Sequence, residues 1–257
     1  MTHEEKRLYL IKSLLSEQKR YADIAVPSDT QGQKDLLRSL MNVRMPSPLS
    51  DEYIKTESEY LKEETERKGV THFCDLPPVL NGIYLWQGDI TTLDCDAIVN
   101  AANSAMLGCF QPLHNCIDNC IHSYAGLRLR NVCAEIMKKQ GHEEETGRAK
   151  ITPAFNLPCR YVIHTVGPIV HGVLNRHHEE QLASCYTSCL KLAEEKGCKS
   201  IAFCCISTGV FGFPQRRAAE IAVKTVKEYK ADYKSDIGVI FNVFKNEDYG
   251  FYRELLR

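Results

Sequence analysis

Residues 201–214 read Ile-Ala-Phe-Cys-Cys-Ile-Ser-Thr-Gly-Val-Phe-Gly-Phe-Pro, and this stretch indicates the fold class most directly. The apolar run at 201–206 predicts a strand that is covered on both faces, because no polar residue alternates with the apolar ones. A loop from Ser207 follows, and Pro214 fits the first turn of the helix that comes next. A glycine-containing loop between a strand and a helix is typical of a phosphate-binding site.

Four further apolar runs and three helical patterns surround this stretch. The runs lie at 83–86, 97–99, 161–163 and 237–241, and the helical patterns cover 117–139, 177–196 and 214–229. Short buried strands that alternate with helices predict an α/β fold with a mostly parallel sheet. In such folds ligands bind at the carboxyl ends of the strands, so the loops there are the places to look for a site.

Residues 1–72 have a different character, with three helical segments and no cysteine. Apolar residues recur at helical spacing over 3–19, Asp29 is placed to cap a second helix, and Ser50 a third that stops at Gly69. We therefore expect two domains, an N-terminal helical extension over 1–72 and a second domain over 73–257.

The composition narrows the function classes. The chain has 257 residues with 32 basic and 33 acidic side chains, and its net charge of -1 removes the electrostatic argument for nucleic-acid or membrane partners. It begins with charged residues rather than a secretion signal, and no apolar run approaches the roughly 18 residues of a membrane span. We expect a cytoplasmic protein whose 12 cysteines are reduced core thiols, metal ligands or both.

Two more loops carry polar residues where expected strands end. Gly88-Asp89-Ile90-Thr91 follows the run at 83–86, and its carboxylate could accept a hydrogen bond from an exocyclic amine such as that of adenine. Asn100-Ala101-Ala102-Asn103 follows the run at 97–99, and its amides suit sugar hydroxyls. Taken alone, either segment could be an ordinary turn.

In this order the three loops resemble the ADP-ribose-binding loops of the macrodomain family. The matching segments are 88–91, 98–103 and 206–214, together with His-Thr-Val-Gly-Pro at 164–168. The resemblance spans about 82–242 and implies a macrodomain-like three-layer α/β/α fold with a mixed, mostly parallel sheet. It also implies an ADP-ribose cleft, with Asp89 and Ile90 at the adenine and Asn103 at the distal ribose. Cys116, Ile117 and Asp118 also line this cleft. The diphosphate would lie on the loop formed by Ser207, Thr208, Gly209, Val210 and Phe211.

The segment before the 117–139 helix departs from the family pattern. Residues 107–119 read Leu-Gly-Cys-Phe-Gln-Pro-Leu-His-Asn-Cys-Ile-Asp-Asn, where ordinary hydrolytic macrodomains have a glycine run. Cys109, His114 and Cys116 place two thiols and an imidazole within eight residues, which predicts a Zn²⁺ site. Three ligands are typical of a catalytic rather than a structural site, although Cys120 or His122 could supply a fourth.

This arrangement resembles the zinc-dependent macrodomains among bacterial protein-ADP-ribose hydrolases, a class that also has an N-terminal helical extension. The resemblance implies removal of mono-ADP-ribose from a protein side chain. Asn103 and Asp118 are the candidate catalytic residues, with Asp118 orienting or deprotonating water or holding a ribose hydroxyl. Zinc could orient the ribose, polarise the scissile bond or activate water. The class also implies a partner, a GcvH-like lipoate carrier modified by a sirtuin-type transferase.

Two other functions fit the same residues. The protein could be a non-catalytic reader that binds ADP-ribose, or a redox or structural zinc protein whose cysteines serve folding. We interpret the other cysteines as packing thiols: Cys204 and Cys205 are expected within a strand, Cys185 and Cys189 on one helix face, and Cys133 away from any metal-like group. His164 is expected to be a hydrogen-bonded core histidine.

Overall fold

A seven-stranded mixed sheet forms the centre of the computed structural model, which describes residues 1–257. The five central strands run parallel, and an antiparallel strand closes each edge. The strands in spatial order are β2 (Pro78–Leu80), β3 (Ile83–Gln87), β9 (Gly238–Val243), β8 (Ser200–Phe203), β5 (Ala97–Ala102), β7 (Tyr161–Val166) and β6 (Ala149–Pro153). The predicted α/β fold with a mixed, mostly parallel sheet is confirmed.

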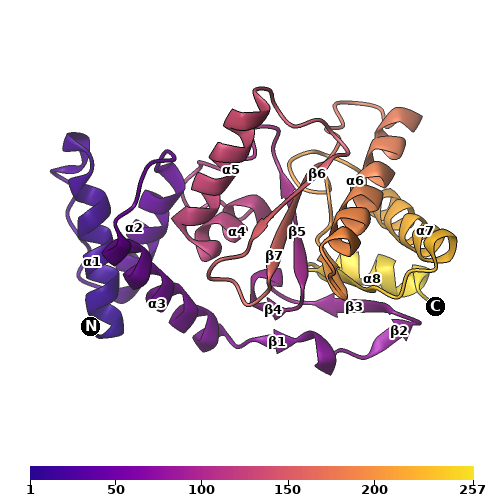
Figure 1. Cartoon of the computed structure of the whole chain (residues 1–257), viewed down its shortest axis with the longest axis horizontal. Coiled ribbons are helices and arrows are strands. Elements are labelled where there is room, and N and C mark those ends of the chain that lie inside the picture. The colour runs from indigo at the N-terminus through magenta and orange to yellow at the C-terminus, as the bar shows by residue number, and fades with distance from the viewer.

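Helices cover both faces of this sheet, which is why its central strands are apolar without alternation. All residues of β8 and β9 are buried. In Figure 1, α4 (Ile117–Ala125) and α5 (Leu127–Gln140) lie on one side, and α6 (Arg176–Glu195), α7 (Gln215–Tyr233) and α8 (Asn246–Leu255) lie on the other. None of the helices has the length and apolar character needed to span a membrane.

Three helices form an N-terminal lobe over residues 1–72. They are α1 (His3–Ser16), α2 (Thr30–Val43) and α3 (Asp51–Lys68), with a 3-10 turn at Lys19–Tyr21. As expected, the side chains of Asp29 and Ser50 cap α2 and α3, and Gly69 ends α3 at a φ of 89°. The lobe has its own apolar cluster, which includes Leu127 from the start of α5, so it packs against the α4–α5 side of the sheet (Figure 1).

Short elements connect the lobe to the sheet. The strand β1 (Thr71–His72) pairs with β4 (Leu93–Asp94), and 3-10 turns occupy Phe73–Asp75 and Ile90–Thr92. In the sheet itself, the chain passes from β5 to the edge strand β6, on the far side of β7, and passes from β8 in the opposite direction to β9. The loops after β5 and β8 therefore diverge from adjacent strands, which is the arrangement that creates a ligand crevice in an α/β sheet.

The structure corrects several sequence expectations. The single helix expected over 117–139 is two helices, because Gly126 breaks it at a φ of 90° and a ψ of 174°. Asn100 lies within β5 rather than in a loop, since parallel pairing with β7 continues to Ala102. Cys204 and Cys205 lie beyond the end of β8. The expectations also missed β2, β6 and α8, whose residues are partly exposed and show no continuous apolar run.

Candidate functional site: the loops after β5 and β8

The loop between β5 and α4 brings Cys109, His114 and Cys116 together. The Cys109 Sγ lies 3.6 Å from the His114 Nδ1, and the three ligand atoms lie within 4.8 Å of one another. All three residues are half-buried. Cys116 also caps α4, since its Sγ accepts a hydrogen bond of 3.4 Å from the Asn119 N–H. The residues expected to form a zinc site therefore converge on one point.

The chemistry of these donors fits zinc. Two thiols and one imidazole are the soft and intermediate ligands that Zn²⁺ takes. Burial, together with the neighbouring Cys109, raises the pKa of Cys116 to about 12. Two adjacent thiolates need a positive charge between them, and a divalent cation provides it when it displaces the thiol protons.

The two residues considered as a fourth ligand face elsewhere. The Cys120 Sγ accepts a hydrogen bond of 3.7 Å from the Arg38 Nη2 of α2. His122 forms a second, fully buried group with Cys133 and His164. The expectation that Cys133 stands apart from any metal-like group is therefore wrong. Cys133 on α5 and His164 on β7 lie close together in the core, with His122 beside them.

His164 is a hydrogen-bonded core residue, as expected. Its Nδ1 accepts from the Asn100 amide at 3.1 Å, and its Nε2 lies 3.0 Å from the Thr152 hydroxyl. His122 differs, because neither of its ring nitrogens has a hydrogen-bond partner. Burial lowers the pKa of both imidazoles, so both rings are neutral.

Asp118, in the first turn of α4, is held by two asparagines. Its Oδ1 accepts a hydrogen bond of 2.8 Å from Asn100, and its Oδ2 accepts one of 3.1 Å from Asn103. Because the carboxyl group is only 5% exposed, burial raises its pKa to about 6, although both amides oppose that shift. The two predicted catalytic residues, Asn103 and Asp118, are thus in direct contact. Asn100 also belongs to the site, although the sequence pattern indicated it only as part of the 100–103 segment and not as a site residue.

The loop after β8 offers free backbone donors. The N–H groups of Ser207, Gly209, Val210 and Phe211 make no hydrogen bond within the molecule. Two backbone bonds hold the loop in shape, from Phe213 N–H to the Ser207 carbonyl and from Gly212 N–H to the Gly209 carbonyl. Ser207 has a φ of 65°, and its buried hydroxyl has no partner. Unpaired N–H groups in a loop that leads into a helix suit anionic oxygens such as those of a diphosphate.

Asp89, at the end of β3, has one oxygen engaged and one directed outward. The Oδ1 accepts from the backbone N–H of Thr91 at 3.0 Å and from its hydroxyl at 2.6 Å, and Ile90 is buried between them. The Oδ2 lies 3.5 Å from the Lys68 ammonium at the end of α3. Lys68 also lies 3.4 Å from the centre of the Tyr124 ring. The N-terminal lobe therefore reaches this end of the site, which the sequence pattern did not suggest.

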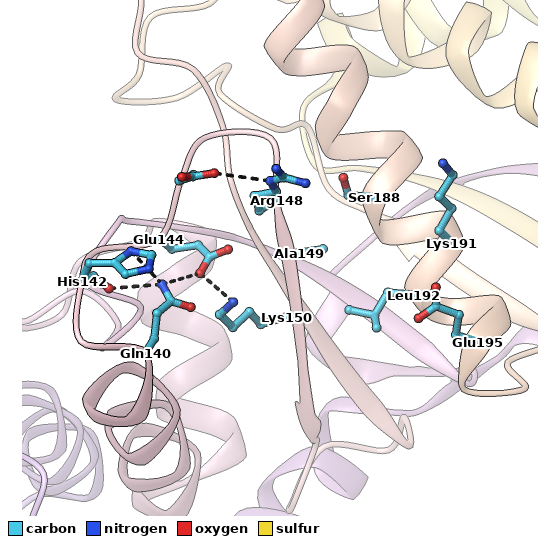
Figure 2. Close-up of a pocket in the computed structure, with 11 residues that line it drawn as sticks. Gln140, His142, Glu144, Arg148, Ala149, Lys150, Ser188, Lys191, Leu192 and Glu195 are labelled. Atoms are coloured by element: carbon cyan, nitrogen blue, oxygen red, sulfur yellow. Dashed lines mark hydrogen bonds and ion pairs between the residues drawn. The ribbon is translucent and has the colours of Figure 1, made fainter.

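A separate cavity of about 400 Å³ lies between α6, β6 and the loop that precedes β6 (Figure 2). Polar side chains that bond to one another line it, with Glu144 2.9 Å from Lys150 and 3.0 Å from the Gln140 amide. None of the predicted site residues faces this cavity. Because this cavity contains none of those residues, the candidate site is the set of loops after β3, β5 and β8 described above.

The combination of this fold with three such loops agrees with a family model described as Macro domain, which matches residues 99–222. A protein-ADP-ribose hydrolase from Treponema medium is 57% identical over 260 residues, covering 100% of both chains. The chain belongs to the macrodomain family. A protein of the same name from Staphylococcus aureus (strain MRSA252) is 48% identical over 248 residues, covering 96% of this chain and 93% of its own.

A solved macrodomain resembles most of this chain. The crystal structure of the Trypanosoma brucei macrodomain in complex with ADP-ribose superposes with a TM-score of 0.67 at 29% identity. The match covers 86% of this chain and 95% of that one.

Proposed function

We propose that this macrodomain is a zinc-dependent hydrolase that removes mono-ADP-ribose from modified protein side chains. The observation that carries the proposal is the convergence of Cys109, His114 and Cys116 on the loop that leads into Asp118. Binding of ADP-ribose alone does not require a metal-binding group on the loop that leads into a buried carboxylate, whereas both suit hydrolysis. The two relatives named protein-ADP-ribose hydrolase, which match nearly the whole chain, support this activity.

In this proposal the macrodomain loops hold ADP-ribose from end to end. Asp89 and Ile90 take the adenine, and the free N–H groups of residues 207–211 take the diphosphate. Asn103 and the exposed side of the loop after β5 take the distal ribose. Cys116, Ile117 and Asp118 border the same sugar from the start of α4.

Cys109, His114 and Cys116 would hold the zinc, which when bound supplies a Lewis acid that can polarise an oxygen or acidify water. Asp118 accepts a proton from the attacking water, or holds a ribose hydroxyl, at an oxygen that Asn103 or Asn100 orients. The asparagine amides donate to the carboxylate and keep it aimed at the sugar. Because the carboxyl group is buried, water competes little for those bonds.

We extend the proposal to the substrate, a protein modified by mono-ADP-ribose. The resemblance to zinc-dependent macrodomains favours a GcvH-like lipoate carrier that a sirtuin-type transferase modifies. A gene for either protein beside the gene for this chain would support that assignment. A modified carrier that the purified protein leaves intact, while it cleaves another mono-ADP-ribosylated protein, would contradict it.

The test of the hydrolase is turnover with and without metal. The purified protein is incubated with a mono-ADP-ribosylated protein, alone, after complete zinc removal, and after zinc is restored. We expect release of ADP-ribose only when zinc is present. Release that survives zinc removal would contradict the metal mechanism, and binding of ADP-ribose without release under any condition would identify a reader.

A Cys116→Ala variant separates catalytic from structural zinc. We expect the variant to lose zinc and turnover but to stay folded, because three ligands on one loop are not needed to close the core. Its melting temperature should fall by only about 2–4 °C, from loss of the α4 cap. Collapse of the fold in this variant would instead indicate a structural ion. Cys198→Ala, at a buried cysteine far from the loop, is the control.

A further inference from the structure

The loop over residues 107–116 is held by a helix of the N-terminal lobe. The Asn42 Oδ1 on α2 accepts a hydrogen bond of 3.0 Å from the Leu113 N–H. The Arg38 Nη2, one turn earlier on the same helix, donates a bond of 2.7 Å to the His114 carbonyl. These two contacts fix the peptide groups on both sides of the Leu113–His114 pair, and so they fix the backbone from which the His114 imidazole projects.

The same helix reaches the Cys109 end of the loop through Asn119. The Arg38 Nη2 donates to the Asn119 Oδ1 at 2.9 Å. That contact orients the Asn119 amide, whose Nδ2 donates to the carbonyls of Cys109 at 3.1 Å and Gln111 at 2.9 Å. Asn119 is fully buried, so no water competes for these bonds.

A third connection runs through Arg130 on α5. Its Nε donates to the Leu107 carbonyl at 2.8 Å, and its Nη1 bonds three carbonyls at the end of α2, those of Met41, Asn42 and Arg44. Its guanidinium also lies 4.4 Å from the centre of the Phe110 ring. Arg130 is 3% exposed, so the start of the loop and the end of α2 share one buried cation.

The loop needs such support. Leu113 has a φ of 56°, a left-handed conformation that costs a non-glycine residue free energy and persists only where the surroundings enforce it. The side chains of Arg38 and Asn42 lie outside the apolar cluster of the lobe and point at the loop. The lobe therefore contributes polar groups that its own folding does not require.

We infer that α2 positions the metal-binding loop, with Arg38 and Asn42 as positioning residues for His114 and, through Asn119, for Cys109. This inference rests on the proposed function for the metal and gives the N-terminal lobe a role in the reaction. Groups that orient metal ligands typically change metal affinity 10- to 100-fold when they are removed. The lobe is then a part of the catalytic unit.

The experiment compares the full-length variants Arg38→Met and Asn42→Ala with Arg67→Met, the same class of change at an exposed arginine of the same lobe. Zinc affinity is measured by competition with a chromogenic chelator. We expect the dissociation constant to rise roughly 10- to 100-fold in the first two variants and to stay unchanged in the control. The affinity for ADP-ribose should change less than the zinc affinity, because Arg38 and Asn42 do not hold the loop after β8, which takes the diphosphate in the proposed function.

Hydrogen exchange of the chelator-treated protein gives a readout that does not need the metal. We expect faster exchange of the amides at 107–116 in Arg38→Met and Asn42→Ala, with the amides of α1 and α5 still protected. Arg38→Lys should recover part of the zinc affinity, because one ammonium can still reach the His114 carbonyl. It also serves as the test if Arg38→Met fails to fold.

The outcomes separate the inference from the proposed function. Wild-type zinc affinity together with wild-type exchange at 107–116 in the Arg38 and Asn42 variants would overturn the positioning role. Uniform loss of protection over the whole lobe would also overturn it, since the residues would then serve only folding. A wild-type protein that binds no zinc would contradict the proposed function, while the exchange data would still decide whether α2 holds the loop.

Discussion

Asp118 is a buried carboxylate with one asparagine amide on each oxygen. Asn100 comes from the middle of β5 and Asn103 from the residue just after that strand, so a rigid strand fixes both donors. Such bonds orient a general base more firmly than solvent does. The carboxylate also lies at the first turn of α4, where the helix dipole favours negative charge and partly offsets the cost of burial.

The Asp118→Asn variant should fold and bind ADP-ribose but lose turnover. The amide keeps the shape of the side chain and removes its basicity, so we expect the catalytic rate to fall roughly 10²- to 10⁴-fold. Calorimetry with ADP-ribose and single-turnover release from a modified protein measure the two properties. Asp232→Asn, at an exposed position on α7, is the control, and a full rate in Asp118→Asn would remove this residue from the catalytic role.

At the scale of elements, the junction of α4 and α5 shows how one glycine shapes the site. Gly126 adopts a φ of 90° and a ψ of 174°, a combination almost confined to glycine. A Cβ there would lie 2.5 Å from the Glu57 Oε2 of α3 and 2.8 Å from the Asn156 amide. The break directs α5 away from α4, and so lets Arg130 reach both α2 and the loop after β5.

Gly126→Ala should destabilise the fold more than Gly141→Ala. Both glycines have a positive φ, but a Cβ at Gly141 would meet no atom within 4 Å. We expect a loss of about 1 kcal/mol for Gly141→Ala from backbone strain, and at least about 2 kcal/mol for Gly126→Ala, where the clash adds to the strain. Urea denaturation measures both, and equal losses would show that the contact with Glu57 relaxes freely.

At the scale of the whole molecule, a buried acid joins the lobe to the sheet domain. Glu57 on α3 is fully buried, and its Oε1 accepts a hydrogen bond of 3.0 Å from the Leu127 N–H at the start of α5. Its Oε2 has no partner. Burial raises the pKa of Glu57 to about 7, although the Leu127 bond and the nearby Arg128 and Arg44 oppose that shift.

The stability of the protein should therefore fall as pH rises from about 4.5 to about 7. Over this interval the folded protein keeps a proton on Glu57 that the unfolded chain releases. The stability that this proton contributes is therefore fully present below the pKa of Glu57 in the unfolded chain, and it is lost as pH rises through the pKa of Glu57 in the folded protein. A difference of this size between the folded and unfolded pKa values corresponds to roughly 3 kcal/mol of stability. Glu57→Gln should remove this part of the pH dependence.

Chemical denaturation between pH 5 and pH 8 checks this expectation. The stability of Glu57→Gln relative to the wild-type protein should increase with pH and level off above about pH 7. Glu52→Gln, on the exposed face of the same helix, is the matched control and should track the wild-type protein. Parallel curves for wild type and Glu57→Gln would show that Glu57 keeps its ordinary acidity.

Much of the fold could be predicted because its signals are local. The apolar runs at 83–86, 97–99, 161–163, 201–206 and 237–241 each overlap an observed strand, and the caps at Asp29 and Ser50 begin the expected helices. Edge strands were missed because half of their residues face solvent and their pattern is weak. The break at Gly126 was missed because the helical spacing continues across it. The backbone conformation and the contact with α3 that require a glycine arise only in the folded structure.

The same distinction applies to the site. Cys109, His114 and Cys116 lie within eight residues, so a single loop between a strand and a helix is enough to bring them together, and their chemistry could be inferred from the chain alone. The groups that hold this loop, Arg38 and Asn42, lie about 70 residues away. Their role depends on how the lobe docks on α4 and α5, which burial and shape decide over long sequence separations and which no local pattern encodes.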